Sequence, residues 1–170
     1  MESELDELDR ALLSALHDSS RIGVLELSRT LGVARATVTA RLQRLENNEV
    51  ITGYRPQIGL AAAGYGVQAF VTLEIAQGAL GDVVAVLEQI PGVLEAFATT
   101  GAGDVLCRVA AASHDDLQRT LIVLNQSRTI ARSTSVVVLS ELVEFRTMPL
   151  LNTAEPDRQP KAPAYRPSRE

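Results

Sequence analysis

The spacing of apolar residues changes once along this chain, and this change restricts the folds that the chain can adopt. Apolar side chains first recur every three or four positions, which is typical of amphipathic helices with one buried stripe. The three stripes are Leu5, Leu8, Leu12 and Leu16, then Val24, Leu27 and Leu31, then Val38, Leu42 and Leu45. From Val67 to Ile75 apolar residues occupy every second position, which indicates a strand with one apolar face. The pattern therefore predicts a helical N-terminal domain followed by a domain that contains a sheet.

The second and third predicted helices have the layout of a helix-turn-helix. Gly32 follows the second stripe, where a chain that leaves a helix favours a residue that tolerates positive φ. The third stripe follows closely, which leaves room for only a tight turn between the two helices. Beyond it, the segment that begins at Val50 and turns around Gly53 predicts two short strands, the second ending near Ile58, that would form a wing. Three-helix units without a DNA role can show the same pattern, so the spacing alone leaves both interpretations open.

If the third stripe faces inward, the opposite arc of this helix carries small and polar side chains. Small side chains allow a close approach to a groove, Thr and Gln can hydrogen-bond base edges, and Arg suits phosphates. The residues predicted to contact DNA are therefore Arg35, Ala36, Thr37, Thr39, Ala40, Arg41, Gln43 and Arg44, with Arg55 in the wing. Arg41 has an equally good alternative, in which its aliphatic stem covers the seam between two helices.

The charge distribution permits a nucleic-acid partner, although the net charge of the chain is −5. Six arginines stand against three glutamates between residues 21 and 55, whereas the charged residues before this segment are six acidic residues and one arginine. Phosphates respond to the local field of the basic segment, so double-stranded DNA remains a suitable partner.

The composition also limits the compartment and the chemistry. Cys107 is the single cysteine, no apolar run approaches the ~20 residues needed to cross a bilayer, and no signal-peptide pattern is present. We therefore expect a cytoplasmic protein that does not enter a membrane. His17 and His114 do not form a metal-binding pattern, and paired carboxylates or a nucleophile motif are not found, so we expect no metal, no cofactor and no enzymatic activity.

The second half of the chain predicts a sheet with two helices. Strands are expected at residues 67–75, 93–99, 105–111 and 135–142, and helices at 80–87 and 117–124, the second of them capped by Ser113. This βαββαβ order is a ferredoxin-like domain with both helices on one face, so the fold class is α+β with an N-terminal winged helix-turn-helix. The domains are expected at residues 1–60 and 61–148, followed at 149–170 by a proline-rich tail that we expect to be disordered.

The last predicted strand is apolar on both faces from Val136 to Leu139, although one face of such a sheet carries no helix. A second copy of the same sheet is the simplest cover. This predicts a homodimer in which each subunit presents its third predicted helix to one half of a palindromic DNA site.

A glycine-rich turn, Thr100–Asp104, separates the second and third predicted strands. Backbone N–H groups in such a turn can hold a carboxylate, and Asp104 can meet an ammonium group. In the alternative interpretation the glycines only form a β-turn, and Asp104 accepts hydrogen bonds from nearby backbone N–H groups.

The chain resembles the Lrp/AsnC, or feast/famine, family of bacterial and archaeal regulators over roughly residues 4 to 146. The residues that carry the resemblance are Leu5–Arg10, Glu26–Ser28, Val38, Arg41, Leu42, Leu45–Glu46 and Val50–Tyr54. The resemblance implies a DNA-binding regulator whose second domain assembles dimers and often rings of dimers. It also implies a small effector, commonly an amino acid, at a junction between dimers. The implied effector-binding residues are Thr100, Gly101, Gly103, Asp104, Ser133 and Ser135.

Four positions depart from the family pattern. Ala34 stands where the family usually has a serine that caps the third helix, and alanine there forgoes ~1 kcal/mol of helix stability. Asn48 and Glu49 replace an acidic residue and a glycine, which makes Asn48 the candidate for a left-handed conformation. Thr129 stands where a glycine is expected before the last strand.

The sequence therefore predicts a sequence-specific transcriptional regulator that responds to a small effector. An effector-independent architectural DNA-binding protein would share every feature except a working pocket. Siroheme decarboxylases resemble the same two-domain architecture, but handling a tetrapyrrole would require histidine and basic groups in the second domain, which offers His114 alone among histidines.

Overall fold

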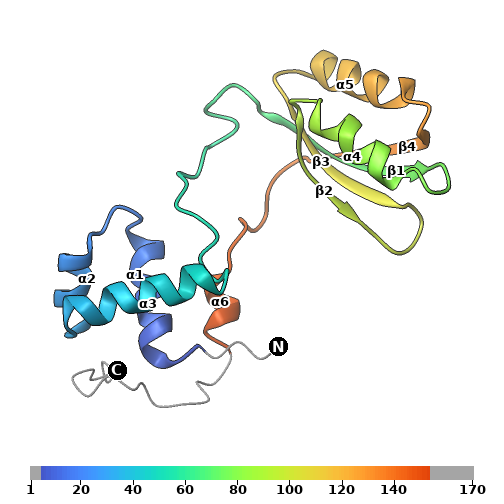
Figure 1. Cartoon of the computed structure of the whole chain (residues 1–170). Helices are drawn as coiled ribbons and strands as arrows, with labels where there is room; N and C mark the ends of the chain where they lie inside the picture. Colours follow the sequence, from blue (N-terminus) through green and yellow to red (C-terminus); the bar gives the residue numbers. More distant parts are fainter. Residues whose placement is uncertain (1–4, 154–170) are drawn as a thin grey trace. The chain divides into compact units, whose positions relative to one another are not determined.

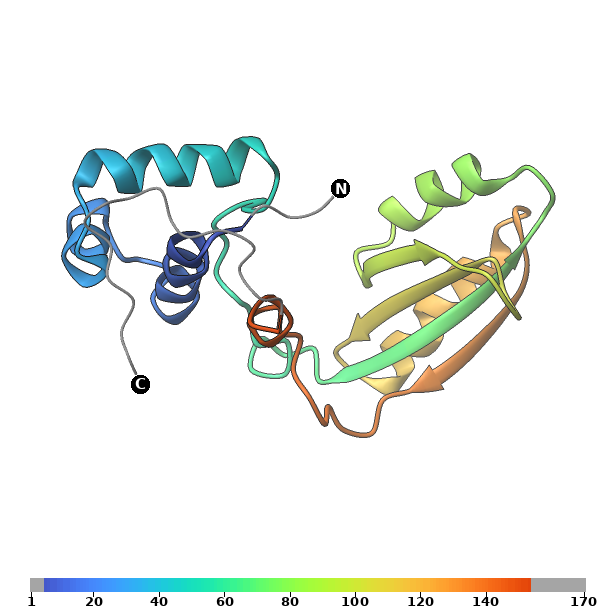
Figure 2. The ribbon, with the colours of Figure 1, turned by 90° about the horizontal axis from the view of Figure 1, so that it is seen from below.

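The computed structural model describes residues 5–153, which fall into two compact units. The first unit combines the N-terminal helices with the segment that begins at Glu144, and the second unit is Gln57–Val143 (Figures 1 and 2). The chain after Val143 returns to the helical unit, so the second compact unit ends at this residue.

Three helices build the first unit as the stripes predict: α1 (Glu7–Asp18), α2 (Val24–Leu31) and α3 (Arg35–Asn47). Gly32 ends α2 in the left-handed conformation with φ of 65°. Six stripe residues and the turn valine form the buried core, namely Leu5, Leu8, Leu12, Leu27, Val33, Val38 and Leu45, and the other four stripe residues are partly buried against it. Because each stripe supplies one side of this core, the helix-turn-helix prediction is confirmed.

The two ends of α3 lack the residues that stabilise helix ends most. Ala34 is the N-cap and has no side-chain acceptor, as the sequence indicates. At the other end, Glu49 N donates to Glu46 O and Val50 N to Leu45 O, which is the Schellman arrangement. The prediction that Asn48 takes the left-handed conformation is wrong: its φ is −90°, and Glu49, at the glycine position, has φ of 56°.

The wing differs from the prediction, because the described residues between 50 and 58 contain no strand. The backbone N–H groups of Val50 and Ile51 both donate to Leu45 O at the end of α3, which withdraws them from a hairpin. An isolated two-stranded hairpin is also only marginally stable. Instead, the Tyr54 hydroxyl donates to Glu46 Oε1 at 2.8 Å, so this segment is anchored to α3 by a side chain.

The beginning of the predicted tail is ordered against α1. Residues Met148–Leu151 form a short helix, α6, in which the Leu151 side chain packs against the core of the first unit. The Arg10 guanidinium also donates to Leu151 O. Leu151 alone supplies this apolar contact, and the proline-rich composition of the predicted tail gave no sign of it. The rest of the predicted tail, residues 154–170, lies outside the described residues.

The second unit confirms the βαββαβ order. Its elements are β1 (Val67–Ile75), α4 (Leu80–Glu88), β2 (Val93–Ala98), β3 (Val105–Ala111), α5 (His114–Gln126) and β4 (Ile130–Val137). The antiparallel sheet has the strand order β2-β3-β1-β4. Alternate residues of β1 and β3, such as Val71 and Cys107, share one buried cluster with Val83 of α4 and Leu124 of α5, so both helices cover the same face. Burial in this cluster raises the pKa of the Cys107 thiol to about 11.

The last strand begins five residues earlier than predicted and ends at Val137. Ile130 is buried opposite Ile75, and this pairing extends the strand through polar residues that the apolar pattern excluded. Leu139 and Leu142 lie beyond the strand and are 98% and 90% exposed. Only Val136 and Val137 of the predicted two-faced apolar segment therefore belong to the sheet.

Candidate nucleic-acid interface and effector loop

The outward face of α3 is small and polar, as predicted. Arg35, Ala36, Thr39, Ala40 and Gln43 are exposed, and Thr37 is half-buried. A shallow open concavity runs along this helix and is lined by Ala36, Thr37, Ala40, Arg41 and Arg44. The absence of bulky side chains along this face leaves room for another surface to approach the helix closely.

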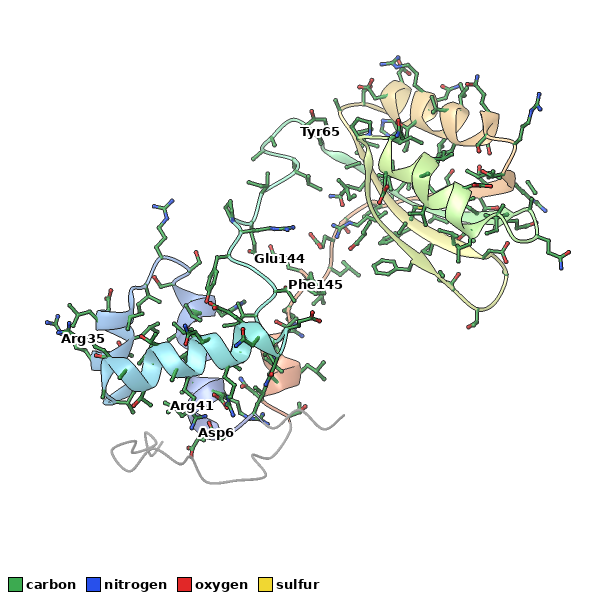
Figure 3. All side chains as sticks on the ribbon, in the orientation of Figure 1. Asp6, Arg35, Arg41, Tyr65, Glu144 and Phe145 are labelled. Atoms are coloured by element: carbon green, nitrogen blue, oxygen red, sulfur yellow. The ribbon has the colours of Figure 1, made fainter. Side chains whose placement is uncertain are left out.

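Arg35 and Arg55 are the exposed arginines among the residues predicted to contact DNA. Arg35 stands at the beginning of α3 (Figure 3). Arg55 follows Tyr54 in the segment after α3, where the hydrogen bond from Tyr54 to Glu46 holds the backbone. Burial and the Glu46 carboxylate together raise the pKa of Tyr54 to about 12, so its hydroxyl remains a donor at neutral pH. Within residues 5–153, neither arginine takes part in an ion pair.

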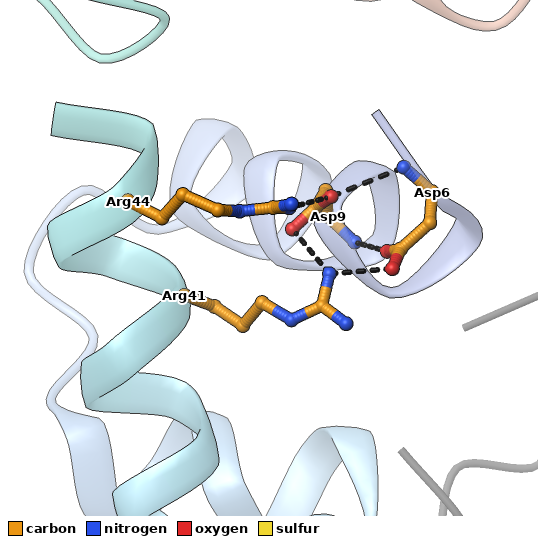
Figure 4. A network of polar contacts seen from close by, with 4 residues as sticks. All are labelled: Asp6, Asp9, Arg41 and Arg44. Carbon is orange, nitrogen blue, oxygen red and sulfur yellow. Dashed lines mark hydrogen bonds and ion pairs between the residues drawn. The ribbon is translucent and has the colours of Figure 1, made fainter. Parts of the chain in front are cut away.

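Arg41 and Arg44 instead face α1, where they close a network with two aspartates (Figure 4). Arg41 Nη1 lies 2.5 Å from Asp6 Oδ2 and 2.9 Å from Asp9 Oδ1, and Arg44 pairs with Asp9 Oδ2. The two aspartates also cap α1, because Asp6 Oδ1 accepts from Asp9 N at 2.9 Å and Asp9 Oδ2 accepts from Asp6 N at 3.0 Å. One pair of carboxylates thus both begins α1 and fixes it to α3.

The electrostatics of the network favour the charged forms. Burial alone would raise the pKa of Asp6, but the Asp9 amide and Arg41 outweigh it, so the pKa lies below its ordinary value. Burial would likewise lower the pKa of Arg41, whereas its two aspartate partners raise it.

Arg41 and Arg44, which were predicted to contact phosphates, are thus both paired with aspartates in this structure. The network supports the alternative for Arg41, whose side chain is only 14% exposed in the seam between helices. The aspartates were missed as functional residues, although two acidic residues three positions apart before an apolar run are a recognisable capping pattern.

The glycine-rich turn is held to the end of β1 by its own backbone and by Asp104. Asp104 N donates to Leu73 O at 2.8 Å, and Asp104 Oδ2 accepts from Ile75 N at 2.8 Å. Gly103 packs so closely on β1 that a Cβ atom would lie 2.2 Å from the Thr72 methyl group. These contacts match the alternative in which Asp104 serves a turn, although its Oδ1 atom takes no part in them.

The two serines predicted to bind the effector lie apart from the turn that contains Asp104. Thr100 and Gly101 are exposed in the turn, on the β3 side of β1. Ser133 and Ser135 lie in β4, on the other side of β1, opposite Leu73 and Val71, and Ser133 Oγ donates to Asn125 Oδ1 at 2.7 Å. Strands on the two sides of a central strand are separated by about 10 Å. The six residues therefore form two groups rather than one compact site.

Comparisons with known proteins match both units. Residues 5–46 match the model of the AsnC-type helix-turn-helix domain, and residues 68–148 match that of the Lrp/AsnC ligand binding domain. This chain belongs to the Lrp/AsnC family.

Individual family members resemble the chain over most of its length. The transcriptional regulator AldR of Mycolicibacterium smegmatis is 31% identical over 143 residues, which cover 82% of this chain and 84% of AldR. The structure of Escherichia coli AsnC has 28% identity and a TM-score of 0.80 over 85% of this chain and 99% of AsnC. A Neisseria meningitidis transcriptional regulator solved as a complex with L-Met has 25% identity and a TM-score of 0.80 over 88% of this chain and 99% of its own. The chain is thus an Lrp/AsnC transcriptional regulator with a DNA-binding helix-turn-helix, and not an enzyme.

The helix-free face of the sheet in this Lrp/AsnC regulator carries exposed apolar side chains. Phe70, Phe97 and Val136 share this face according to the strand register and are 43%, 52% and 65% exposed. Arg108 lies on the same face, donates to Gln68 Oε1 and lies 3.8 Å from a Glu95 oxygen. Val137 pairs with Ala69 and belongs to the helix-covered side. None of the helices in the described residues is long and apolar enough to span a membrane.

Proposed function

We propose that this Lrp/AsnC regulator reads DNA with the outward face of α3, acts as a dimer in the cytoplasm, and responds to an amino acid bound by its second unit. The observation that carries the DNA-reading proposal is the exposed row of small and polar side chains on α3, bordered by Arg35 at the helix start. Ala36, Thr37, Thr39, Ala40 and Gln43 would contact bases, whereas Arg35 and Arg55 would contact phosphates.

Gln43 provides the test of base reading. A duplex selected from a random pool by the wild-type protein serves as the specific site, and an unselected random pool serves as the reference. Gln43→Ala should cost about 1 to 3 kcal/mol on the selected duplex and little on the random pool, because a lost base contact affects only the sequence it reads. Arg35→Ala should weaken both alike and flatten the salt dependence by about one unit of slope. Equal losses on both duplexes for Gln43→Ala would contradict base reading.

The dimer proposal is supported by the exposed apolar row on the helix-free face. A second copy would cover Phe70, Phe97 and Val136 and so remove them from water. Val136→Asp should then give monomers, because a carboxylate without a partner is strongly unfavourable in an apolar interface. Val84→Asp is the matched control, since Val84 is 47% exposed on α4, which covers the opposite face. If sedimentation shows the same assembly for both variants, the helix-free face is not the interface.

The amino-acid proposal is supported by the L-Met complex of the related regulator and by the backbone of the Thr100–Asp104 turn. Asp104 Oδ1 remains for an ammonium group, and the turn offers N–H groups for a carboxylate. The proposed contacts are Thr100, Gly101, Gly103 and Asp104, with Ser133 and Ser135. Because these two groups lie on opposite sides of β1, the proposal requires that different subunits supply them to one pocket.

The Asp104 contact to Ile75 favours a second candidate, an architectural DNA-binding protein without an effector. Calorimetric titration of each common amino acid into wild-type protein and Asp104→Asn distinguishes the two. A sensor gives heat with wild type and loses it in the variant, while both bind DNA equally without the amino acid. An architectural protein gives no heat with any amino acid, and the variant then shows only a lower melting temperature.

A further inference from the structure

Asp9 is the one fully buried charged side chain in the part of the chain that the structure describes. Both of its oxygens are used: Oδ1 accepts from Arg41, and Oδ2 accepts from Arg44 and from Asp6 N. A buried carboxylate that loses a cationic partner cannot regain hydration by turning toward water, so each of these contacts is costly to break.

Arg44 differs from Arg41 in its exposure. Its side chain is 41% exposed, whereas that of Arg41 is 14% exposed. Arg44 also lines the concavity on α3 together with Ala36 and Ala40, so it borders the surface proposed to read DNA. Arg44 thus lies within reach of that surface, yet Asp9 holds its guanidinium on the side of α1 (Figure 4).

We propose that Asp9 is a positioning residue for DNA recognition, which keeps Arg44 away from the phosphates and thereby limits binding to DNA of arbitrary sequence. Contacts between arginines and phosphates add affinity for every sequence alike, so each one that is withheld leaves discrimination more dependent on the base-reading face. The unequal burial makes the restraint effective, since an exposed aspartate would release Arg44 to a phosphate at little cost. The inference rests on the DNA-binding function and adds to it a means of limiting non-specific affinity.

The salt dependence of binding tests the inference, because each phosphate contact adds about 0.9 unit to the slope of log K against log salt concentration. The proteins compared are the full-length wild type, Asp9→Asn, Arg44→Gln and the double variant, on short random-sequence duplexes between about 50 and 200 mM salt. Asn is close in shape to Asp and can still accept from the Asp6 amide, so the start of α1 is kept. Arg44→Gln leaves Asp9 paired with Arg41, so this variant also retains the core of the network.

Asp9→Asn should bind random duplexes more tightly, with a slope steeper than wild type by about 0.9, because Arg44 is released while Asp6 still holds Arg41. Arg44→Gln should have the wild-type slope, and the double variant should return to it. Glu7→Gln is the control for charge, since it removes one carboxylate from the same first turn of α1 and leaves the four network residues in place. It should reproduce only the part of the gain in affinity that comes from net charge.

Two results would overturn the inference. A flatter slope for Arg44→Gln alone would show that Arg44 already contacts phosphates in the wild type. An Asp9→Asn slope equal to that of Glu7→Gln would show that release of Arg44 adds no contact. If circular dichroism shows that Asp9→Asn is unfolded, the slope of Arg44→Gln decides the question by itself. A wild type that binds no duplex would instead contradict the DNA-binding function, which is a separate outcome.

Discussion

Helices α1 and α3 share one buried core in the first unit and are joined by ion pairs, but their ends are stabilised in different ways. α1 begins with a reciprocal cap made by Asp6 and Asp9, and the acidic side chains in its first turn interact favourably with the positive end of the helix dipole. α3 begins at Ala34 without a side-chain cap, has no acidic residue in its first turn, and ends at a left-handed glutamate. The stability of α3 therefore depends on its neighbours, above all on the carboxylates of α1.

This difference agrees with the roles proposed for the two helices. A capped, acidic helix start repels phosphates, whereas an uncapped start with Arg35 retains its free N–H groups and its positive dipole end for an anion. The helix proposed to present its surface to DNA thus lacks local stabilisation at its start, and the ion pairs to Asp6 and Asp9 provide it from the buried side. Four substitutions test this division.

Asp9→Ala should have the largest effect, a loss of about 3 to 5 kcal/mol, because it leaves two guanidinium groups without their buried partner. The loss should be confined to the first unit. Hydrogen exchange followed by mass spectrometry should show faster exchange in α1, α2 and α3 and unchanged exchange in β1 and β3. Asp18→Ala, an exposed position at the end of α1, is the control and should change stability by less than about 0.5 kcal/mol. Equal effects of the two substitutions would show that the network is not what holds α3.

Asp6→Ala should cost about 1 to 2 kcal/mol, since the N-cap and one partner of Arg41 are lost together. Asp6→Asn should cost less, because asparagine caps equally well and only the charge is removed. The pKa of Asp6 is lowered in the folded protein from 3.8, so its charge contributes fully above that value and loses its contribution as the pH falls through the folded pKa. Melting curves of wild type and Asp6→Asn should therefore differ at neutral pH and converge in acid. A constant difference would contradict this assignment.

The sequence predicts the turn between α2 and α3 better than it predicts the partners of the side chains on α3. Gly32 and Ala34 could be interpreted correctly because turn and cap geometry depends on a few adjacent residues. The inward stripe of α3 was also correct, since periodicity specifies which side of a helix is apolar. Periodicity does not specify what lies opposite each remaining side chain, so Arg41 and Arg44 were placed at the DNA although α1 lies against them.

The second unit shows the same limit. Alternation identified β1 and its buried face, but β4 was placed too late, because Arg132, Ser133 and Thr134 interrupt the apolar pattern between Ile130 and Val136. The effector residues were grouped by their resemblance to a family, whereas in this chain the sheet order separates β3 from β4. Neither result depends on local sequence, so neither could have been predicted from spacing.

Ala34→Ser should stabilise the first unit by about 1 kcal/mol, because the backbone at Ala34, with φ of −61° and ψ of 146°, already suits a capping residue. The serine oxygen would accept a hydrogen bond from the first turn of α3. Urea denaturation of wild type and variant measures the gain. Ala36→Ser is the control, because Ala36 is exposed and lies two residues after the N-cap, inside α3, so this variant should give no gain. If Ala34→Ser is neutral, the start of α3 is already satisfied by other contacts, and the contrast with α1 is weaker than proposed.

Glu49→Gly should give the smallest effect, a gain of about 0.5 kcal/mol. Glu49 has φ of 56°, where an L-residue with a Cβ atom pays roughly 1 to 2 kcal/mol and glycine pays nothing. Glycine also has more freedom in the unfolded chain, which costs about 0.5 to 1 kcal/mol and offsets part of the gain. Glu49→Ala is the decisive control, because it removes the same charge and keeps the Cβ atom, so it should not be stabilising. Urea denaturation of the three proteins separates the causes: a gain in both variants would assign the effect to charge near the negative end of the helix dipole, whereas a gain in glycine alone assigns it to the left-handed backbone at the end of α3.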